Sequence, residues 1–393
     1  LIQLRRVDQI RLEGGNRFVQ EIMAEFARRL ARRQGPQCQL YAYSETSLLM
    51  APELSGSDQW SSWITETMHA LTQPVAREER SYTPQLAVYV VPDADQLSRS
   101  ELAGRLETTI QSNQHTGQGV EFYNPEMAHA LRARVEMSDL LRSAQSRGEL
   151  FLVFQPLVDA IDGTCVGAEV LMRWDNGTLG TVSPATFIPV AEDSGLIGEF
   201  TEWMIATAWR ESRRDPGQHY RYLSINISPV HIEQPDFLSR LRSLIAREGI
   251  DPTYISIEIT EGVLLQESIS NQDVINELVK IGFSLSIDDF GTGYSNLTYL
   301  RRLAVDRIKI DRSFVMDLVN SDGTRNTRAT PLVEAMVFMA KTLGIGTLAE
   351  GVETEAQAEV LRDLGCEAFQ GYLFGKPATL AETSDDQGTQ RVG

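Results

Sequence analysis

Acidic residues interrupt or close several apolar segments in the second part of the sequence. Glu169, Glu258 and Glu350 each stand in or at the end of such a segment, and Asp288 and Asp289 close another. Burying a carboxylate is costly unless a cation compensates its charge. The pattern therefore predicts one shared site that holds several carboxylates and a source of positive charge.

Lysine is rare in this chain, yet one lysine falls inside an apolar segment. The sequence has four lysines and 32 arginines, and Lys309 lies in RIKID, while Asn226 adds a neutral oxygen in SINIS. One ammonium group cannot balance five carboxylates, and hard divalent cations with oxygen ligands, Mg²⁺ or Mn²⁺, supply the missing charge. Adjacent Asp288 and Asp289 fit a site of two ions about 3.5–4 Å apart, which activates water for in-line attack on phosphorus.

Each of these residues also has a simpler structural interpretation when it is taken alone. An acidic residue at a strand end is most often a helix N-cap or part of a surface ion pair, and Asp289 and Glu350 fit these roles. The segment DDFGTGYSNL at 288–297 fits a phosphate-binding turn or an ordinary tight turn. The histidines show no ligand spacing, which disfavours a zinc site. One shared site explains all the strands more economically than separate reasons for each.

The elements that must position these residues follow a repeating order from Glu149 onward. Short apolar strands alternate with helical segments, and eight such strands over about 230 residues predict a (β/α)8 barrel with its active site at the C-terminal strand ends. The predicted strands are 151–158, 166–174, 221–228, 254–260, 283–290, 306–310, 347–352 and 369–374. The predicted helices are 200–214, 236–248, 271–281, 294–302, 329–343 and 354–364.

The first part of the chain predicts a smaller, separate domain. Residues 1–10 predict a strand that enters a turn, residues 39–50 and 85–91 predict further strands, and residues 18–33 and 58–71 predict helices. This alternation is typical of one α/β or α+β domain.

The domain boundaries follow from these elements. The smaller domain is placed at 1–123, and a periodic segment from an Asn-Pro pair to Gly148 predicts a connecting helix at 124–148. The barrel is placed at 149–381, and the polar segment 382–393 predicts a disordered tail.

Composition and charge exclude several classes of function. The 393 residues are 42% hydrophobic and 23% charged, as in folded globular proteins. The net charge is −18, and residues 151–393 carry 35 acidic against 20 basic side chains. We therefore expect no binding of duplex nucleic acid and no membrane contact.

The sequence also bears on location. There is no apolar run of about 20 residues that could cross a bilayer, and we expect no signal peptide. The widely spaced Cys38, Cys165 and Cys366 predict a reducing, cytoplasmic location. A first residue other than Met predicts a fragment of a longer protein, with the cytoplasmic part of a membrane-anchored or sensor protein as one alternative.

Residues 149–378 resemble the EAL domain, a phosphodiesterase that converts cyclic di-GMP to 5′-pGpG. The resemblance implies an α/β fold, an EAL-type (β/α)8 barrel with one antiparallel strand, usually the first, and two bound Mg²⁺ or Mn²⁺ ions. The name-giving triplet reads Glu169-Val170-Leu171 in place of Glu-Ala-Leu, which removes no ligand. The matching motifs are FQPLVD, EVLMRW, SPATFIPVAEDSGLI, SINIS, IEITEG, SIDDFGTGYSNL, VDRIKID, LAEGVET and FQGYLFGKP.

The resemblance also implies a role for individual residues. The implied catalytic residues are Glu350, as general base, and Lys309, which would hold the water and the phosphate. Glu261 is implied to brace the loop 288–297. The implied metal ligands are Glu169, Asn226, Glu258, Asp288 and Asp289, and the implied substrate-binding residues are Gln155, Leu171, Arg173 and, as a supporting polar group, Gln370.

Residues 1–123 resemble a degenerate GGDEF domain, which has the diguanylate cyclase fold. LIQLRRVDQI and GGNRFVQEIMAEFARRL fit its start, but the signature position reads YSETS at 43–47. Both glycines that let the backbone approach a triphosphate are missing, and Gln3 stands where the family has a metal-binding aspartate. The resemblance implies an inactive, regulatory domain, with GTP binding left open.

The leading hypothesis is a cyclic di-GMP phosphodiesterase dependent on Mg²⁺ or Mn²⁺. The alternative is a non-catalytic cyclic di-GMP receptor, and the complete set of ligands favours catalysis because a receptor can lose ligands without penalty. An unrelated metal-dependent barrel hydrolase would require the motif series to arise by chance. The resemblance further implies a homodimer formed through helices near the 288–297 loop, and a bacterial second-messenger role in biofilm formation and motility.

Overall fold

The computed structural model describes residues 1–33, 39–52, 57–77, 80–112, 119–214, 220–262, 269–292, 304–320 and 322–382. The chain divides into two compact units, Leu1–Glu136 and Met137–Gly393. The division falls inside helix α4 (Pro125–Ala144). The helix predicted at 294–302 lies outside the described residues, as does the predicted tail beyond residue 382.

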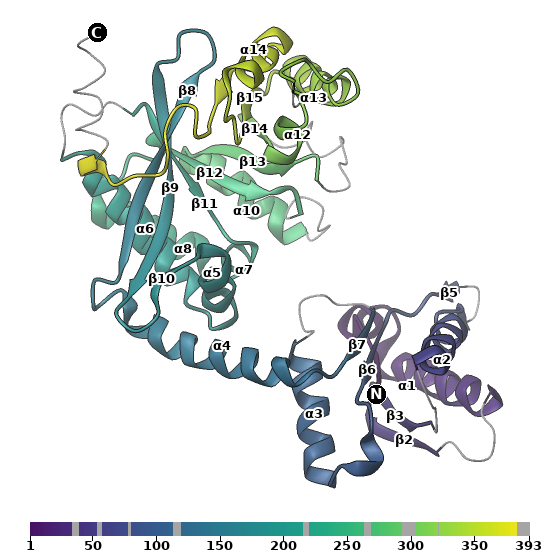
Figure 1. Ribbon diagram of the computed structural model, residues 1–393. Helices are drawn as coiled ribbons and strands as arrows, with labels where there is room; N and C mark the ends of the chain where they lie inside the picture. Colours follow the sequence, from purple (N-terminus) through teal and green to yellow (C-terminus); the bar gives the residue numbers. More distant parts are fainter. Residues whose placement is uncertain are drawn as a thin grey trace. The chain divides into compact units, whose positions relative to one another are not determined.

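The second unit is a closed eight-stranded barrel (Figure 1). Its strands are β8 (Leu150–Asp159), β9 (Cys165–Asn176), β11 (Tyr222–Asn226), β12 (Ile255–Thr260), β13 (Ser284–Phe290), β14 (Arg307–Ile310), β15 (Gly346–Ala349) and β16 (Ala368–Phe369). Neighbours from β9 round to β16 pair in parallel, whereas β8 pairs antiparallel with both β9 and β16. This ring confirms the predicted barrel with an antiparallel first strand. A short strand, β10 (Gly180–Val182), pairs with the C-terminal end of β9.

The two faces of a barrel strand carry different side chains, as β12 shows. Successive residues of a strand point to opposite faces, so Ile255, Ile257 and Ile259 share one face and Ser256 and Glu258 share the other. The three isoleucines are fully buried in the apolar core. Ser256 Oγ lies 2.9 Å from the Ser286 hydroxyl of β13. The polar faces of neighbouring strands therefore meet inside the barrel, and the apolar faces pack against the surrounding helices.

Helices cover the outside of the barrel (Figure 1). Among the described residues, no helix has the length and apolar content needed to cross a lipid bilayer. The helices of this unit are α5 (Pro184–Asp193), α6 (Ile197–Ser212), α7 (Pro229–Ile232), α8 (Phe237–Glu248), α10 (Ile269–Ile281), α12 (Arg312–Met316), α13 (Thr330–Leu343) and α14 (Glu355–Leu364).

Helix α14 illustrates how the sequence sets an element's ends. The Thr354 hydroxyl accepts a hydrogen bond from the Gln357 amide, and the Gln357 side chain accepts one from the Thr354 amide. This capping box satisfies two amide groups that the first helical turn leaves without partners. Gly365 ends the helix in the left-handed region, which a residue without a Cβ adopts at no steric cost.

Among the differences between the sequence predictions and the structure of the barrel unit, two have a clear physical cause. The last strand, predicted at 369–374, covers only Ala368–Phe369 because the chain turns at Gly371, where the Phe374 amide bonds back to the Gly371 carbonyl. Helix α5 was not predicted, since it contains Pro189 and begins with Pro184. Proline at the first helical position is well tolerated, because the amide there has no partner within the helix.

The first unit is a five-stranded sheet with helices, ordered β2-β3-β1-β6-β7. Its apolar core has two parts, one under α1 and α2 and a smaller one under α3. Its elements are β1 (Ile2–Leu4), α1 (Val7–Arg33), β2 (Gln39–Ser44), β3 (Ser47–Ala51), α2 (Ser57–Leu71), β4 (Val75–Arg77), β5 (Arg80–Tyr82), β6 (Leu86–Val90), η1 (Ala94–Gln96), α3 (Arg99–Ser112) and β7 (Gly119–Phe122).

The first unit also departs from the predictions in places. Residues 39–50 form a hairpin instead of one strand, because β2 and β3 pair antiparallel across a turn at Glu45 and Thr46. The turn contains neither glycine nor proline, the usual turn signals, and was therefore not predicted. Helix α1 begins at Val7, well before the predicted start, and is kinked at Gly15 in the left-handed region. Helix α3 was not predicted.

The close approach of Gly371 to Val352 generates a stability prediction. A Cβ at residue 371 would overlap the Val352 backbone, whereas a Cβ at exposed Gly177 would meet no atom within 4 Å. Neither glycine has a positive φ, so the difference between them is steric. We expect Gly371→Ala to lower the free energy of unfolding by about 2–3 kcal/mol and Gly177→Ala to change it by less than about 0.5 kcal/mol. Urea denaturation measures both, and equal effects would contradict the packing described here.

Candidate active site

Lys309 lies inside the barrel and holds carboxylates from several strands together. Its side chain is 1% exposed. Nζ lies 2.6 Å from Glu350 Oε1, 2.7 Å from Glu258 Oε2 and 3.0 Å from Asp288 Oδ1. Glu169 Oε1 lies farther away, at 3.8 Å. One ammonium group on β14 therefore gathers acidic groups from β9, β12, β13 and the residue that follows β15.

The protonation of this cluster follows from burial and charge. Burial alone lowers the pKa of Lys309, but the four carboxylates outweigh it and raise the pKa well above its usual value. The amine is therefore charged. Burial raises the pKa of Glu258 well above its usual value, and it raises the pKa of Glu350 to about 7. The carboxylates outnumber the single ammonium group, so the site favours the binding of further positive charge.

Neutral polar side chains fix the orientation of the buried carboxylates. Asn226 Nδ2 donates to Glu169 Oε1 at 2.7 Å, and Gln370 Nε2 donates to Glu169 Oε2 at 2.6 Å. The same Gln370 nitrogen lies 2.9 Å from Gln155 Oε1. These bonds connect β9, β11 and β8 with the residue that follows β16, and they place Gln155, Asn226 and Gln370 in one cluster with Glu169.

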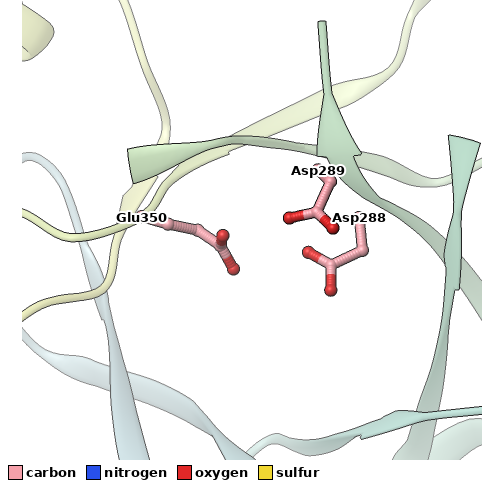
Figure 2. A group of neighbouring side chains, drawn as sticks. All are labelled: Asp288, Asp289 and Glu350. Atoms are coloured by element: carbon pink, nitrogen blue, oxygen red, sulfur yellow. The ribbon is translucent and has the colours of Figure 1, made fainter. Parts of the chain in front are cut away.

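An irregularity in β13 turns two adjacent carboxylates to the same side. In a regular strand Asp288 and Asp289 would point to opposite faces. The pairing of β13 with β14 shifts register between Ile287 and Phe290, and Asp289 has a φ of 53°. Carboxylate oxygens of Asp288, Asp289 and Glu350 consequently lie within 4.8 Å of one another (Figure 2). Bulges that redirect side chains in this way are common beside active sites.

The remaining predicted residues lie around this cluster. Leu171 and Arg173 follow Glu169 at intervals of two, so they share its face of β9. Arg173 is half-buried, and burial lowers the pKa of its guanidinium. Glu261 Oε2 accepts a hydrogen bond from the Gly291 amide at 3.1 Å. Glu261 therefore contacts the first half of the 288–297 loop, whose residues 293–297 lie outside the described residues.

A cavity of about 310 Å³ opens onto the cluster. Five of its lining residues were predicted, namely Gln155, Glu169, Asp288, Glu350 and Gln370. The other lining residues were not predicted, and neither was Ser224, whose hydroxyl donates to Glu258 Oε1 at 2.5 Å. The spacing could have revealed Ser224, since it precedes Asn226 by two residues and therefore lies on the same face of the strand. The lining residues that were missed are Arg312, Gly351, Glu353, Gly371 and Tyr372.

The donor set can be tested against the expected metal ions. The acidic groups of the cluster present only oxygen, the donor that Mg²⁺ and Mn²⁺ prefer. Asp288 Oδ1 is buried and receives no hydrogen bond of good geometry, although Lys309 Nζ lies 3.0 Å away. A buried carboxylate oxygen without a hydrogen bond fits a metal ligand. The residues present therefore fit hard divalent cations.

The fold and the site together define a class of protein. It is a barrel with one reversed strand and a cluster of carboxylates at the C-terminal ends of its parallel strands. Residues 137–377 match the profile of the EAL domain. Because this match covers more than half of the chain, the chain belongs to the EAL domain family. EAL domains generally depend on divalent metal ions, in agreement with the acidic cluster.

Similar proteins include enzymes that act on cyclic di-GMP. The chain is 32% identical to the bifunctional diguanylate cyclase/cyclic di-GMP phosphodiesterase MucR of Pseudomonas aeruginosa, over 78% of this chain and 45% of MucR. It is 30% identical to another cyclic di-GMP phosphodiesterase of that species, over 98% of this chain and 65% of the relative. The solved complex of the MucR phosphodiesterase with cyclic di-GMP superposes with a TM-score of 0.59 at 35% identity, covering 63% of this chain and 99% of that one.

The chain is shorter than the relatives it matches. It spans 31%, 36% and 45% of the length of three curated relatives, two of which are uncharacterized.

Removal of the central ammonium tests the charge balance of the site. We expect Lys309→Met to lower the free energy of unfolding by about 3–5 kcal/mol in metal-free buffer, because it leaves the surrounding carboxylates buried without a partner. Lys280→Met is the matched control, since Lys280 also lies 2.7 Å from a glutamate, Glu277, but is 70% exposed. Chemical denaturation with and without Mn²⁺ measures the effect, and the ion should restore part of the loss. A similar loss in both variants would contradict this account.

Proposed function

We propose that the barrel hydrolyses cyclic di-GMP to 5′-pGpG in a metal-dependent reaction. The observation that carries the proposal is the acidic cluster around Lys309, three of whose carboxylates line a cavity. The family supports the choice of substrate, because relatives along most of the chain bear the name of cyclic di-GMP phosphodiesterases. A similar solved structure contains cyclic di-GMP.

The proposed metal ligands are the residues that the family resemblance implies, and their contacts within the cluster support this assignment. Glu169, Asn226, Glu258 and Asp288 would hold one Mg²⁺ or Mn²⁺ ion, and Asp288 and Asp289 would hold a second. When bound, the ions supply positive charge that activates water and stabilises the charge that develops on the phosphate. The amides of Asn226 and Gln370 keep Glu169 oriented, and the irregularity in β13 keeps the carboxylates of both aspartates close to that of Glu350.

The chain's own groups then carry the proton. Glu350 lines the cavity, and Lys309 Nζ holds its Oε1 at 2.6 Å. In the proposed reaction the Glu350 carboxylate takes a proton from the attacking water. A new P–O bond forms, the bond from phosphorus to one ribose O3′ breaks, that oxygen gains a proton from solvent, and Glu350 releases its own proton to solvent afterwards. The ring opens to linear 5′-pGpG.

Substitution of the proposed base tests this function. We expect wild type to convert cyclic di-GMP to 5′-pGpG with Mg²⁺ or Mn²⁺, and we expect Glu350→Gln to lose about 10²-fold or more of that activity, because the amide cannot accept the proton. Chromatography of the product measures both. Glu359→Gln, an exposed change on α14, is the control and should keep full activity.

The alternative function is one outcome of the same experiment. Tight binding of cyclic di-GMP by wild type without any product would contradict the proposed hydrolysis and would make the barrel a receptor. Equal activity of wild type and Glu350→Gln would leave a phosphodiesterase but would contradict the role of Glu350.

We also propose that residues 1–123 form a degenerate GGDEF-like, regulatory domain. Gln3, which stands at the position of a metal-binding aspartate, is already engaged, because its Oε1 accepts hydrogen bonds from the Tyr89 hydroxyl at 3.1 Å and from Arg5 at 3.3 Å. The divergent signature occupies the turn between β2 and β3. We propose, separately, a cytoplasmic location for this chain, in keeping with its widely spaced cysteines.

We propose that a second copy of the chain covers helix α13. Leu332 and Phe338 are 51% and 71% exposed there, and Ala335 and Met339 lie on the same face at helical spacing. An exposed apolar stripe of this kind is typical of an interface. The resemblance implies a homodimer contact through helices near the 288–297 loop, and Met336 of α13 lies beside Gly291 in that loop.

A charge introduced into this stripe tests the dimer. We expect Phe338→Glu to shift the protein from dimer to monomer, because the interface would have to bury an unpaired carboxylate. Ile161→Glu is the control, since Ile161 is a single exposed residue, 89% accessible, in the turn between β8 and β9. Light scattering after size-exclusion chromatography measures the mass. A monomeric wild type, or a dimeric Phe338→Glu variant, would contradict this interface.

A further inference from the structure

We propose that the first unit binds a small organic cation in a cavity of its own. The cavity has a volume of about 640 Å³, and all of its described lining residues belong to Leu1–Glu136. It is larger than the cavity of about 310 Å³ beside the acidic cluster of the barrel. Protein interiors are normally close-packed, and a volume of this size is typical of a site for a small molecule. The site goes beyond the function proposed for the barrel and does not depend on it.

Three neighbouring strands and one helix give the cavity its apolar walls. Strands β3, β1 and β6 are neighbours in the sheet, and each contributes a buried side chain to the lining, namely Met50, Ile2 and Val88. Leu102 and Leu106 of α3 line the cavity as well. Because β1 pairs with both of its neighbours, the strands hold these walls in place without a ligand. Binding therefore requires little ordering of the protein, which favours affinity.

Two tryptophans add aromatic rings to these walls. Trp60 and Trp63 lie three residues apart on α2, a spacing that places them on one side of the helix. Their ring centroids are 6.1 Å apart, and the ring planes meet at 81°. Both side chains are partly buried against the apolar core, and both line the cavity. Several aromatic rings around one cavity are the arrangement with which proteins hold quaternary ammonium groups.

Two carboxylates give the cavity a negative charge. Asp93 and Asp95 line it from the segment that follows β6, and both are exposed. In the part of the chain that the structure describes, neither carboxylate has an ion pair or a hydrogen bond, and Asp93 does not cap η1 with its side chain. The described lining residues include no lysine, arginine or histidine. Burial lowers the pKa of the Leu1 amino group to about 5, so this group adds no positive charge at neutral pH.

This combination of groups selects the chemical class of the ligand. The faces of indole rings attract a cation, and two carboxylates attract a cation and repel an anion such as a nucleotide phosphate. A bare metal ion would need several more oxygen ligands and would leave the apolar walls without a partner. An organic cation satisfies both parts of the cavity, because its charge faces the rings and carboxylates while its hydrocarbon body covers the apolar walls. A quaternary ammonium group on an apolar body is therefore the expected ligand.

Calorimetric titration of the full chain with three probes tests the site. The probes are benzyltrimethylammonium, choline and 3,3-dimethyl-1-butanol, which is the uncharged isostere of choline. We expect both cations to bind in a saturable manner, and we expect the butanol to bind about 10-fold or more weakly than choline because it lacks the charge. Absence of saturable binding by both cations at millimolar concentration would overturn the proposal. Equal binding of choline and its uncharged isostere would also overturn it.

Substitutions in the lining separate the aromatic contribution from the charge. Trp60→Leu keeps an apolar wall but removes a ring face, and we expect it to weaken binding of benzyltrimethylammonium about 2- to 30-fold. Trp60→Phe should retain part of this affinity, since it keeps an aromatic face. Asp93→Asn removes one charge, and asparagine tolerates the left-handed backbone at this position, where φ is 52°. We expect Asp93→Asn to weaken binding of both cations and to leave binding of the butanol unchanged.

Matched control variants lie outside the cavity. Glu107→Gln removes an exposed charge from α3, and Phe122→Leu removes a 44% exposed aromatic ring at the end of β7. Neither residue lines the cavity, so both variants should bind the cations as wild type does. Asp289→Asn removes a charge from the acidic cluster of the barrel, which could also attract a cation, and it should likewise keep the affinity. A loss in Asp289→Asn together with unchanged binding by Trp60→Leu and Asp93→Asn would place the probe in the barrel and overturn the proposal.

Discussion

One buried ammonium surrounded by four carboxylates is the constraint to which the rest of the barrel is adapted. Most barrels of this size fill their interior with branched apolar side chains, but here the strands that carry the cluster place small hydroxyl groups below it. Ser256 lies 2.9 Å from Ser286, and Ser224 donates to Glu258. These serines satisfy buried oxygen atoms without adding charge. The apolar outer faces of the strands and the helices around them must therefore provide most of the stability.

The second constraint is local and lies in β13. A strand delivers only every second residue to the barrel interior, so a site that needs two adjacent carboxylates has to break the strand's regularity. The register shift and the left-handed backbone of Asp289 do this within one residue. A non-glycine residue in this conformation is unfavourable, and such strain persists only where the surrounding structure enforces it. The hydrogen bond from the Gly291 amide to Glu261 helps to hold the backbone beside Asp289 in place.

Most of the barrel could be predicted from the sequence, because a buried strand is recognisable there as a short apolar segment. The carboxylates were predictable as a group, since each interrupts such a strand. Three kinds of feature were not. Helix α5 was hidden by its prolines, and the hairpin at 39–50 by a turn without glycine. Arg312, Glu353 and Tyr372 meet only because β14, β15 and β16 are neighbours in space. Closeness across strands leaves no periodic signal in a single sequence.

The reversed first strand has a consequence for synthesis on the ribosome. Strand β8 pairs with β9 through a short connection, but its other edge has to wait for β16, the last strand of the ring. The β8–β9 hairpin can form as soon as it emerges, and its free edge stays open while the other strands are made. Glu169 emerges early, whereas Glu350 and Gln370, two of its neighbours, emerge among the last. The nascent chain thus completes its acidic cluster, with the repulsion it contains, only when the barrel closes around it.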